Sequence, residues 1–89
     1  MNIQFTTRIT NSHSASVRLL IEPWGELYRL QAGASVDILV EGPGRDDAAH
    51  AVDAGLLEVE YSADQITVWG WSGSKLEVVG GSEAERHRG

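Results

Sequence analysis

The sequence has 89 residues, which suffice for one small domain, and its 42% hydrophobic and 22% charged residues are close to the average for folded proteins. Seven Lys and Arg against thirteen Asp and Glu give a formal net charge of -6. Because nucleic acids and anionic membrane surfaces bind basic faces, this acidic balance predicts neither as a partner. The chain has no cysteine, which excludes disulfides, thiol nucleophiles and thiolate metal sites.

Hydrophobicity and composition along the chain also predict its location and its domain organisation. No apolar run approaches the roughly 20 residues that span a bilayer. The first five residues, Met-Asn-Ile-Gln-Phe, lack the basic start and apolar stretch of a signal peptide. Together with the absence of cysteine, these features predict a cytoplasmic protein. We expect a single domain over residues 1–80 and a flexible polar tail over residues 81–89.

Apolar and polar residues alternate with a period of two along most of the chain, which is typical of half-buried strands. The expected strands cover residues 2–10, 16–22, 26–31, 35–41, 56–62, 65–71 and 75–80. Gly, Pro, Ser and Asn separate these runs, and no helical crossover lies between them. Short strands with regular turns predict an all-β fold, an antiparallel Greek-key-like β-sandwich of about seven strands.

The residues on the main apolar face of each strand form the predicted core. They are Ile3, Phe5, Val17, Leu19, Ile21, Val36, Ile38, Val40, Leu57, Val59, Ile66, Val68, Leu76 and Val78. Residues 45–55 depart from the strand rhythm because they are rich in alanine, with aspartates to begin a helical turn and Gly55 to end it. We therefore predict a short loop or helical turn there.

Chemistry-bearing clusters are few. Asp46, Asp47, His50 and Asp53 have spacings that would align on a short helix and are weak candidates for a carboxylate–imidazole metal site. We interpret them as a solvated acidic loop and expect neither a metal nor another cofactor. No Gly-x-Ser-x-Gly nucleophile elbow is present, and the glycines at 42 and 44 lack the Gly-Lys-Ser/Thr ending of a phosphate-binding loop. The sequence predicts a protein that is not an enzyme.

The tryptophans carry the main functional signal. On the expected strand 65–71, Ile66 and Val68 point to one face, while Thr67, Trp69 and Trp71 point to the other. Both faces are therefore apolar. Two exposed tryptophans would present about 300–500 Å², which approaches the largest apolar patch of a typical monomer.

Three interpretations of this pattern stay open. Trp69 and Trp71 belong to the core, or they lie on an apolar sheet face that pairs with another copy of the chain or another protein. In the third, Trp24, Trp69 and Trp71 are stacking surfaces for a carbohydrate or another small flat ligand, with Thr67 among the polar groups around them. Tryptophan is a favoured interface anchor, so we take a self-associating interaction module as the leading hypothesis and the ligand-binding domain as the alternative.

The runs Glu22-Pro23-Trp24-Gly25-Glu26 and Trp69-Gly70-Trp71-Ser72-Gly73-Ser74, with Leu30-Gln31-Ala32-Gly33 between them, resemble short bacterial proteins of unknown function. The resemblance covers most of residues 2–80 and implies a compact single-domain β-sandwich, with no activity attached. The succession of short strands, with a Leu-x-x-Gly turn, also resembles cupredoxin-like and immunoglobulin-like sandwiches. Without copper ligands, that resemblance implies architecture alone.

Overall fold

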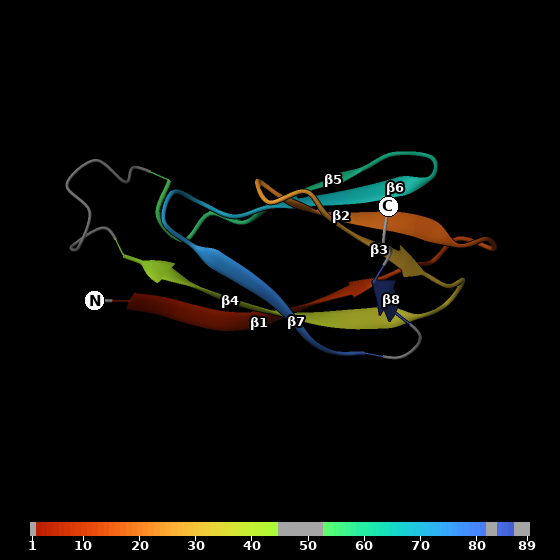
Figure 1. Cartoon of the computed structure of the whole chain (residues 1–89), viewed down its shortest axis with the longest axis horizontal. Coiled ribbons are helices and arrows are strands. Elements are labelled where there is room, and N and C mark those ends of the chain that lie inside the picture. The colour runs from red at the N-terminus through yellow and green to blue at the C-terminus, as the bar shows by residue number, and fades with distance from the viewer. Residues whose placement is uncertain (1, 45–52, 82–83, 87–89) are drawn as a thin grey trace.

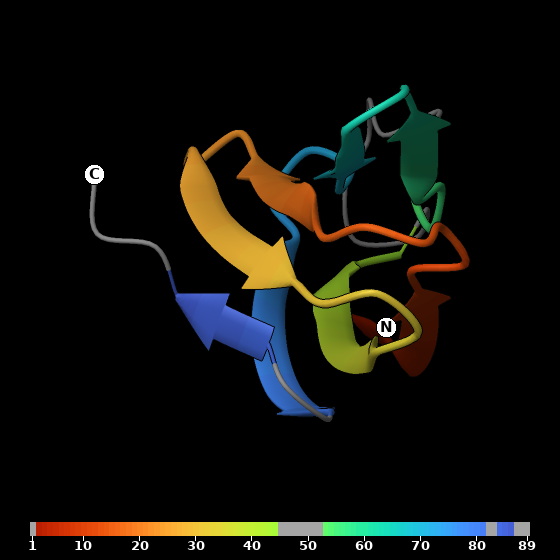
Figure 2. The same ribbon diagram turned by 90° about the vertical axis from the view of Figure 1, so that its right-hand side faces the viewer.

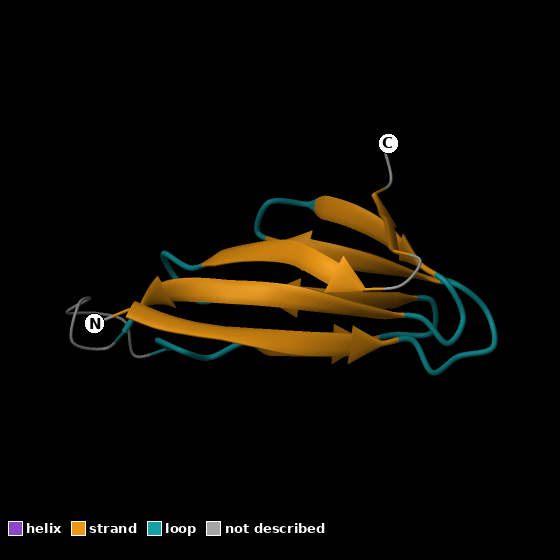
Figure 3. Ribbon diagram, turned by 90° about the horizontal axis from the view of Figure 1, so that it is seen from below, coloured by secondary structure: helices purple, strands orange, loops and turns teal. Residues whose placement is uncertain are grey.

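Strands in two sheets form the protein, which we describe from a computed structural model over residues 2–44, 53–81 and 84–86 (Figure 1). Within these ranges there are eight strands. They are β1 (Asn2–Thr10), β2 (Val17–Glu22), β3 (Glu26–Leu30), β4 (Ser35–Pro43), β5 (Glu58–Tyr61), β6 (Gln65–Trp69), β7 (Lys75–Gly81) and β8 (Ala84–Arg86). The described residues contain no helix, and thus none that could cross a membrane (Figure 3).

A three-stranded sheet in the order β1-β4-β7 faces a five-stranded sheet in the order β5-β6-β2-β3-β8 (Figure 2). The chain passes from one sheet to the other after β1, β3, β4, β6 and β7, while β2 and β3, and likewise β5 and β6, are consecutive antiparallel strands of the larger sheet. Sequence neighbours are therefore often in different sheets, as in Greek-key folds. The prediction of an all-β sandwich is confirmed.

The core lies between the central strands of the two sheets. Val17, Leu19 and Ile21 of β2 face Val36, Ile38 and Val40 of β4, and none of the six exposes more than 4% of its surface. Central strands are covered by neighbours on both edges, which is why their inward residues are buried most completely. The predicted core residues on edge strands, such as Ile3, Phe5 and Val59, are half-buried and pack against this centre.

Asn11 is a fully buried polar residue that the sequence analysis did not place in the core. Its side-chain amide donates hydrogen bonds to the carbonyl oxygens of Ala15, Leu30 and Gln31 at 2.9, 3.1 and 3.1 Å, and its Oδ1 accepts one from the backbone N–H of His13 at 2.9 Å. One asparagine thereby satisfies the backbone of two loops at the same end of the sandwich.

An exposed ion pair joins β1 to β4. Arg8 Nε donates to Asp37 Oδ1 at 2.7 Å and Arg8 Nη2 donates to Oδ2 at 3.2 Å, across a pair of residues that are register partners. The hydrogen bond from Arg8 lowers the pKa of Asp37 below its ordinary value of 3.8.

Several details differ from the sequence-based predictions. β2 and β6 pair in parallel, whereas the other strand pairs are antiparallel. Strands joined by a tight turn pair antiparallel, whereas β2 and β6 are separated in the chain by β3, β4 and β5, a connection long enough for parallel pairing. Within the segment predicted as a flexible tail, Ala84–Arg86 forms β8 beside β3. Of the predicted loop or helical turn at 45–55, residues 45–52 lie outside the described residues, and residues 53–55 form a turn.

Candidate binding surfaces

Trp71 is a core residue. It exposes 3% of its surface, its indole N–H donates to the carbonyl of Pro43 at 2.9 Å, and its ring stacks on Phe5 with centroids 6.1 Å apart. The prediction that Trp69 and Trp71 share one exposed sheet face is therefore wrong for Trp71. The physical reason is that β6 ends at Trp69, so strand alternation no longer governs the side chain two residues later.

Two glycines allow this arrangement by close approach. A Cβ on Gly42 would lie 2.7 Å from the Cα of Ser74 and 3.0 Å from the ring of Trp71. A Cβ on Gly70 would overlap the Oγ of Ser74. That hydroxyl donates to the carbonyl of Trp71 at 2.6 Å and closes the turn between β6 and β7. The turn and the buried indole thus depend on positions without a side chain.

Trp69 lies on the outer face of the five-stranded sheet and exposes 40% of its surface. Register partners place three rows of side chains on this face. One row holds Arg29, Arg18 and Gln65, the next Leu27, Leu20, Thr67 and Glu60, and the third Glu22, Trp69 and Glu58. We call these ten residues the outer face. It has arginines at one end of the strands, glutamates at the other, and leucines between them.

Thr67 belongs to this face but is itself buried, with 7% of its surface exposed. Its neighbours in the same row are Leu20 and Glu60, and its hydroxyl accepts a hydrogen bond from Gln65 Nε2 at 3.0 Å. Thr67 is therefore covered by its neighbours, and its predicted place among the polar groups of a ligand patch is wrong.

Trp24 lies in the turn between β2 and β3 and exposes 48% of its surface. The turn has a cis peptide before Pro23 and a left-handed Gly25 with φ +70°, a conformation that glycine adopts without strain. Trp24 and Trp69 border a shallow hollow of about 550 Å³, which also contacts the turn from Gly70 to Lys75. Two of the three tryptophans predicted as a patch thus meet at an accessible surface, with the third beneath it.

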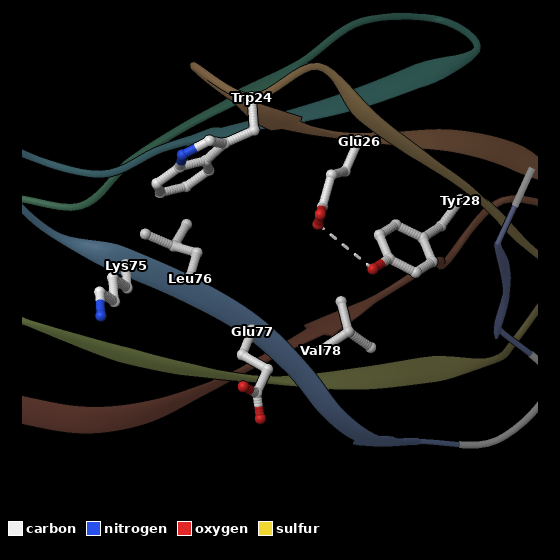
Figure 4. A pocket seen from close by; sticks show the side chains of 7 residues that line it. All are labelled: Trp24, Glu26, Tyr28, Lys75, Leu76, Glu77 and Val78. Atoms are coloured by element: carbon white, nitrogen blue, oxygen red, sulfur yellow. Dashed lines mark hydrogen bonds between the residues drawn. The ribbon is translucent and has the colours of Figure 1, made fainter.

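A second hollow, of about 520 Å³, lies on the other side of Trp24 at the open side of the sandwich (Figure 4). From above it is bordered by Trp24 and by Glu26 and Tyr28 of β3, and from below by residues 75–78 of β7. Tyr28 Oη donates to Glu26 Oε1 at 3.4 Å. Glu26 and Tyr28 were not predicted as site residues. The signal that was available is that they share the inward-facing phase of β3 with the buried Leu30.

Of the weak metal candidates, Asp46, Asp47 and His50 lie outside the described residues, while Asp53 is half-buried in the turn before β5. Among the residues that the structure describes, no group of three or more His, Asp or Glu side chains is placed to hold a metal ion.

Comparison with known proteins adds no relative: no family model, no curated protein and no solved structure matches the chain. The resemblance to short bacterial β-sandwich proteins stays a prediction. The two hollows and the outer face are the accessible surfaces that bear on function.

Proposed function

We propose that this protein is a non-enzymatic interaction module that self-associates through the outer face of its five-stranded sheet. The observation that supports the proposal is the order of side chains along the strands of this face. Arginines lie at one end, Leu20 and Leu27 in the middle, and Trp69 between two glutamates at the other end. An apolar centre with an aromatic anchor and charged ends is the composition of a protein interface.

The charge order makes the face complementary to itself. A homodimer uses the same patch on both copies, related by a twofold axis that lies in the interface. If the axis runs across the strands along the Leu20 row, each copy places its arginine row over the glutamate row of the other. Leu20 then packs against its own counterpart, and Arg18 lies opposite Glu22 of the second copy. Complementary ends fix the register and allow a chain of net charge -6 to approach a copy of itself.

The area of the outer face limits the expected affinity of the dimer. Four strands about 4.8 Å apart and five residues long cover a few hundred Å². A standard complex buries roughly 800 Å² on each partner. We therefore expect a weak dimer in rapid exchange, which forms as concentration rises and weakens as salt screens the charged rows.

Sedimentation equilibrium over a range of concentrations tests the proposal. The chain weighs 9.6 kDa, so the mass should rise toward twice that value, and Trp69→Ala should hold it at the monomer value. Trp24→Ala is the matched control, because it removes a tryptophan of similar exposure, 48% against 40%, that lies off the outer face. Its mass curve should follow that of the unmodified protein.

A charge swap makes the test specific for the charged rows. Arg18→Glu alone should weaken the dimer, and adding Glu22→Arg should restore it because both rows are then reversed together. Arg18 also forms an exposed ion pair with Asp64 at 2.9 Å, whose loss costs at most about 1 kcal/mol of folding stability. A monomeric mass at every concentration, or a dimer that Trp69→Ala leaves intact, would refute the proposal.

A second candidate function, carbohydrate binding, is favoured by the hollow between Trp24 and Trp69. Both rings are accessible, and Ser72 and Lys75 supply polar groups beside them. Sugars stack their apolar faces on such rings and hydrogen-bond at their edges. Tryptophan fluorescence titrated with a panel of mono- and oligosaccharides tests this candidate. A flat response in the unmodified protein, at concentrations where it is monomeric, would remove it.

A further inference from the structure

Two arginines lie side by side at the corner of the outer face where β2 meets β3. Arg18 and Arg29 are register partners on these neighbouring strands, and both are exposed (Figure 2). A hollow of about 130 Å³ is bordered by the two arginines and by Leu27. We propose that this hollow is a binding site for a phosphate group, and that the bound phosphate weakens self-association.

The like charge of the two arginines sets the sign of the ligand charge. Residues directly opposite each other in an antiparallel pair have Cβ atoms about 4.5–5.5 Å apart, and like charges in these positions are destabilising. An anion between the two arginines replaces this repulsion with two attractions. The chain as a whole carries a net charge of -6. Exposed charges farther away than about 8 Å are largely screened at physiological ionic strength, so the two nearby arginines decide which ion binds.

Both arginines keep N–H donors for a ligand. Arg18 uses Nη2 to donate to Asp64 Oδ2 at 2.9 Å, in an ion pair whose side chains are 56% and 72% exposed. Arg29 has no hydrogen-bond or ion-pair partner among the residues whose side chains the structure describes. Because a guanidinium carries five N–H groups and Arg18 shares one nitrogen with an exposed carboxylate, donors of both arginines remain beside the hollow.

The size and lining of the hollow suit phosphate. Its volume of about 130 Å³ is small beside the 520 and 550 Å³ of the other two hollows, which favours a compact ligand. A planar guanidinium donates two parallel N–H bonds to a phosphate or a carboxylate. Two guanidiniums together match a doubly charged anion better than a singly charged one. Inorganic phosphate and a phosphate ester share this chemistry, and Leu27 offers an apolar contact to the alkyl group of an ester.

Phosphate at this corner competes with the second copy for Arg18. In the proposed dimer, Arg18 lies opposite Glu22 of the second copy. A phosphate held by Arg18 places a negative charge where that carboxylate approaches, and like charges across an interface weaken it. This competition rests on the proposed function, whereas the phosphate site itself does not.

Titration followed by amide chemical shifts of the full chain tests the site. The probes are sodium phosphate, sodium ethyl phosphate, sodium acetate and sodium chloride at matched ionic strength and about pH 7.5, where a phosphate ester carries close to two negative charges. We expect phosphate to bind with a dissociation constant of about 1–10 mM and to shift residues 18 and 27–29. Acetate should bind at least about threefold more weakly because it carries one charge. Ethyl phosphate that binds more than about threefold more tightly than phosphate would identify an ester as the source, and a smaller difference would identify free phosphate.

Arg29→Gln and Arg8→Gln are a matched pair of variants, because each removes one exposed arginine, from the outer face and from the other sheet respectively. Arg29→Gln should weaken phosphate binding about fivefold or more, and Arg8→Gln should change it less than about twofold. Arg29→Lys keeps the charge and loses the planar fork, so it should weaken binding about twofold to threefold. Glu85 is the register partner of Arg29 on β8, and Glu85→Gln should tighten binding about twofold by removing a carboxylate from the same row.

Sedimentation equilibrium separates the site from its effect on self-association. Phosphate at about 20 mM, twice the weakest expected dissociation constant, should lower the mass relative to chloride at equal ionic strength. Arg29→Gln should remove that difference. Phosphate-dependent shifts in a chain that is monomeric throughout would support the site and refute the proposed function. The same shifts with a dimer that phosphate leaves intact would overturn the competition.

Three results would overturn the phosphate site. The first is the absence of saturable shifts at residues 18 and 27–29 up to about 100 mM phosphate, ten times the weakest expected dissociation constant. The second is acetate or chloride binding as tightly as phosphate, which would show exposed arginines without a preference for phosphate. The third is equal loss of affinity in Arg29→Gln and Arg8→Gln, which would indicate a response to net charge alone.

Discussion

The two tryptophans that lie two residues apart in the sequence should respond in opposite ways to the same substitution. Trp71 exposes 3% of its surface and Trp69 exposes 40%. Trp71→Ala removes nearly all of a side chain that buries about 200 Å², which is worth about 5 kcal/mol, and it also removes the hydrogen bond to Pro43, worth about 1 kcal/mol. Partial collapse of the cavity brings the expected loss to about 3–5 kcal/mol. Trp69→Ala should cost about 1 kcal/mol in the monomer.

Such a loss is large for this chain. At roughly 0.05–0.15 kcal/mol per residue, 89 residues give a total stability of about 4–13 kcal/mol. Trp71→Ala would therefore bring the protein close to unfolding at room temperature, so Trp71→Phe is the milder companion. It keeps the aromatic stacking on Phe5 and loses the indole N–H, with an expected cost of about 1–3 kcal/mol.

Urea unfolding followed by circular dichroism, at a concentration where the protein is monomeric, measures these differences. The urea midpoint should fall in the order unmodified protein, Trp69→Ala, Trp71→Phe, Trp71→Ala. The dependence of the unfolding free energy on urea concentration should be the same for all variants that fold. The placement of the two rings would be refuted if the free energy of unfolding of Trp71→Ala lay within about 1 kcal/mol of that of the unmodified protein, or if Trp69→Ala lost more than Trp71→Ala.

Three further predictions concern stability. Asn11→Ala should cost about 2–4 kcal/mol because it leaves one buried and two partly buried carbonyl groups without their donor, and Asn11→Asp should cost more because it points a negative charge at them; urea midpoints check both. Gly42→Ala should lower the melting temperature by several degrees, since its Cβ would meet the backbone of Ser74, whereas Gly33→Ala has open space and is strained only by its φ of +77°. Because the folded pKa of Asp37 lies below 3.8, the Arg8 pair stabilises the fold above about pH 4 and stops doing so as pH falls through that lower pKa. Arg8→Gln should therefore lower the urea midpoint at pH 7, and its difference from the unmodified protein should shrink as the pH falls below about 4.

The strands were predictable because alternate residues of a half-buried strand face the core and the solvent, which produces an apolar–polar pattern with a period of two. β1 begins and ends where the alternation does, and the central strands β2 and β4 carry their buried residues at the alternate positions that the pattern indicates. Parallel pairing of β2 with β6 could not be read in this way, because alternation gives the face of each residue and not the neighbour of each strand.

The candidate site was only partly predictable for a related reason. Trp24 and Trp69 are accessible as the sequence indicated, but Trp71 is not, because one glycine ends the alternation between them. Asn11 was missed because buried asparagine is uncommon, and because the carbonyl groups to which its amide donates are brought to it only by the fold. Glu26 was missed because a glutamate in a strand pattern is assigned to solvent by default, whereas the register places it on the inward face.

Glu22 and Glu26 test whether register or proximity in the sequence decides which carboxylate takes part in self-association. They flank the same turn, four residues apart, yet Glu22 shares a row with Trp69 on the outer face, and Glu26 pairs with the inward-facing Ile21. If the turn acted through its charge alone, removing either carboxylate would change self-association equally. If register decides, Glu22→Gln should weaken the dimer in sedimentation equilibrium, while Glu26→Gln should leave the dimer dissociation constant unchanged. Equal effects of the two variants on self-association would mean that the turn acts as one acidic patch and that the face of the strand does not matter.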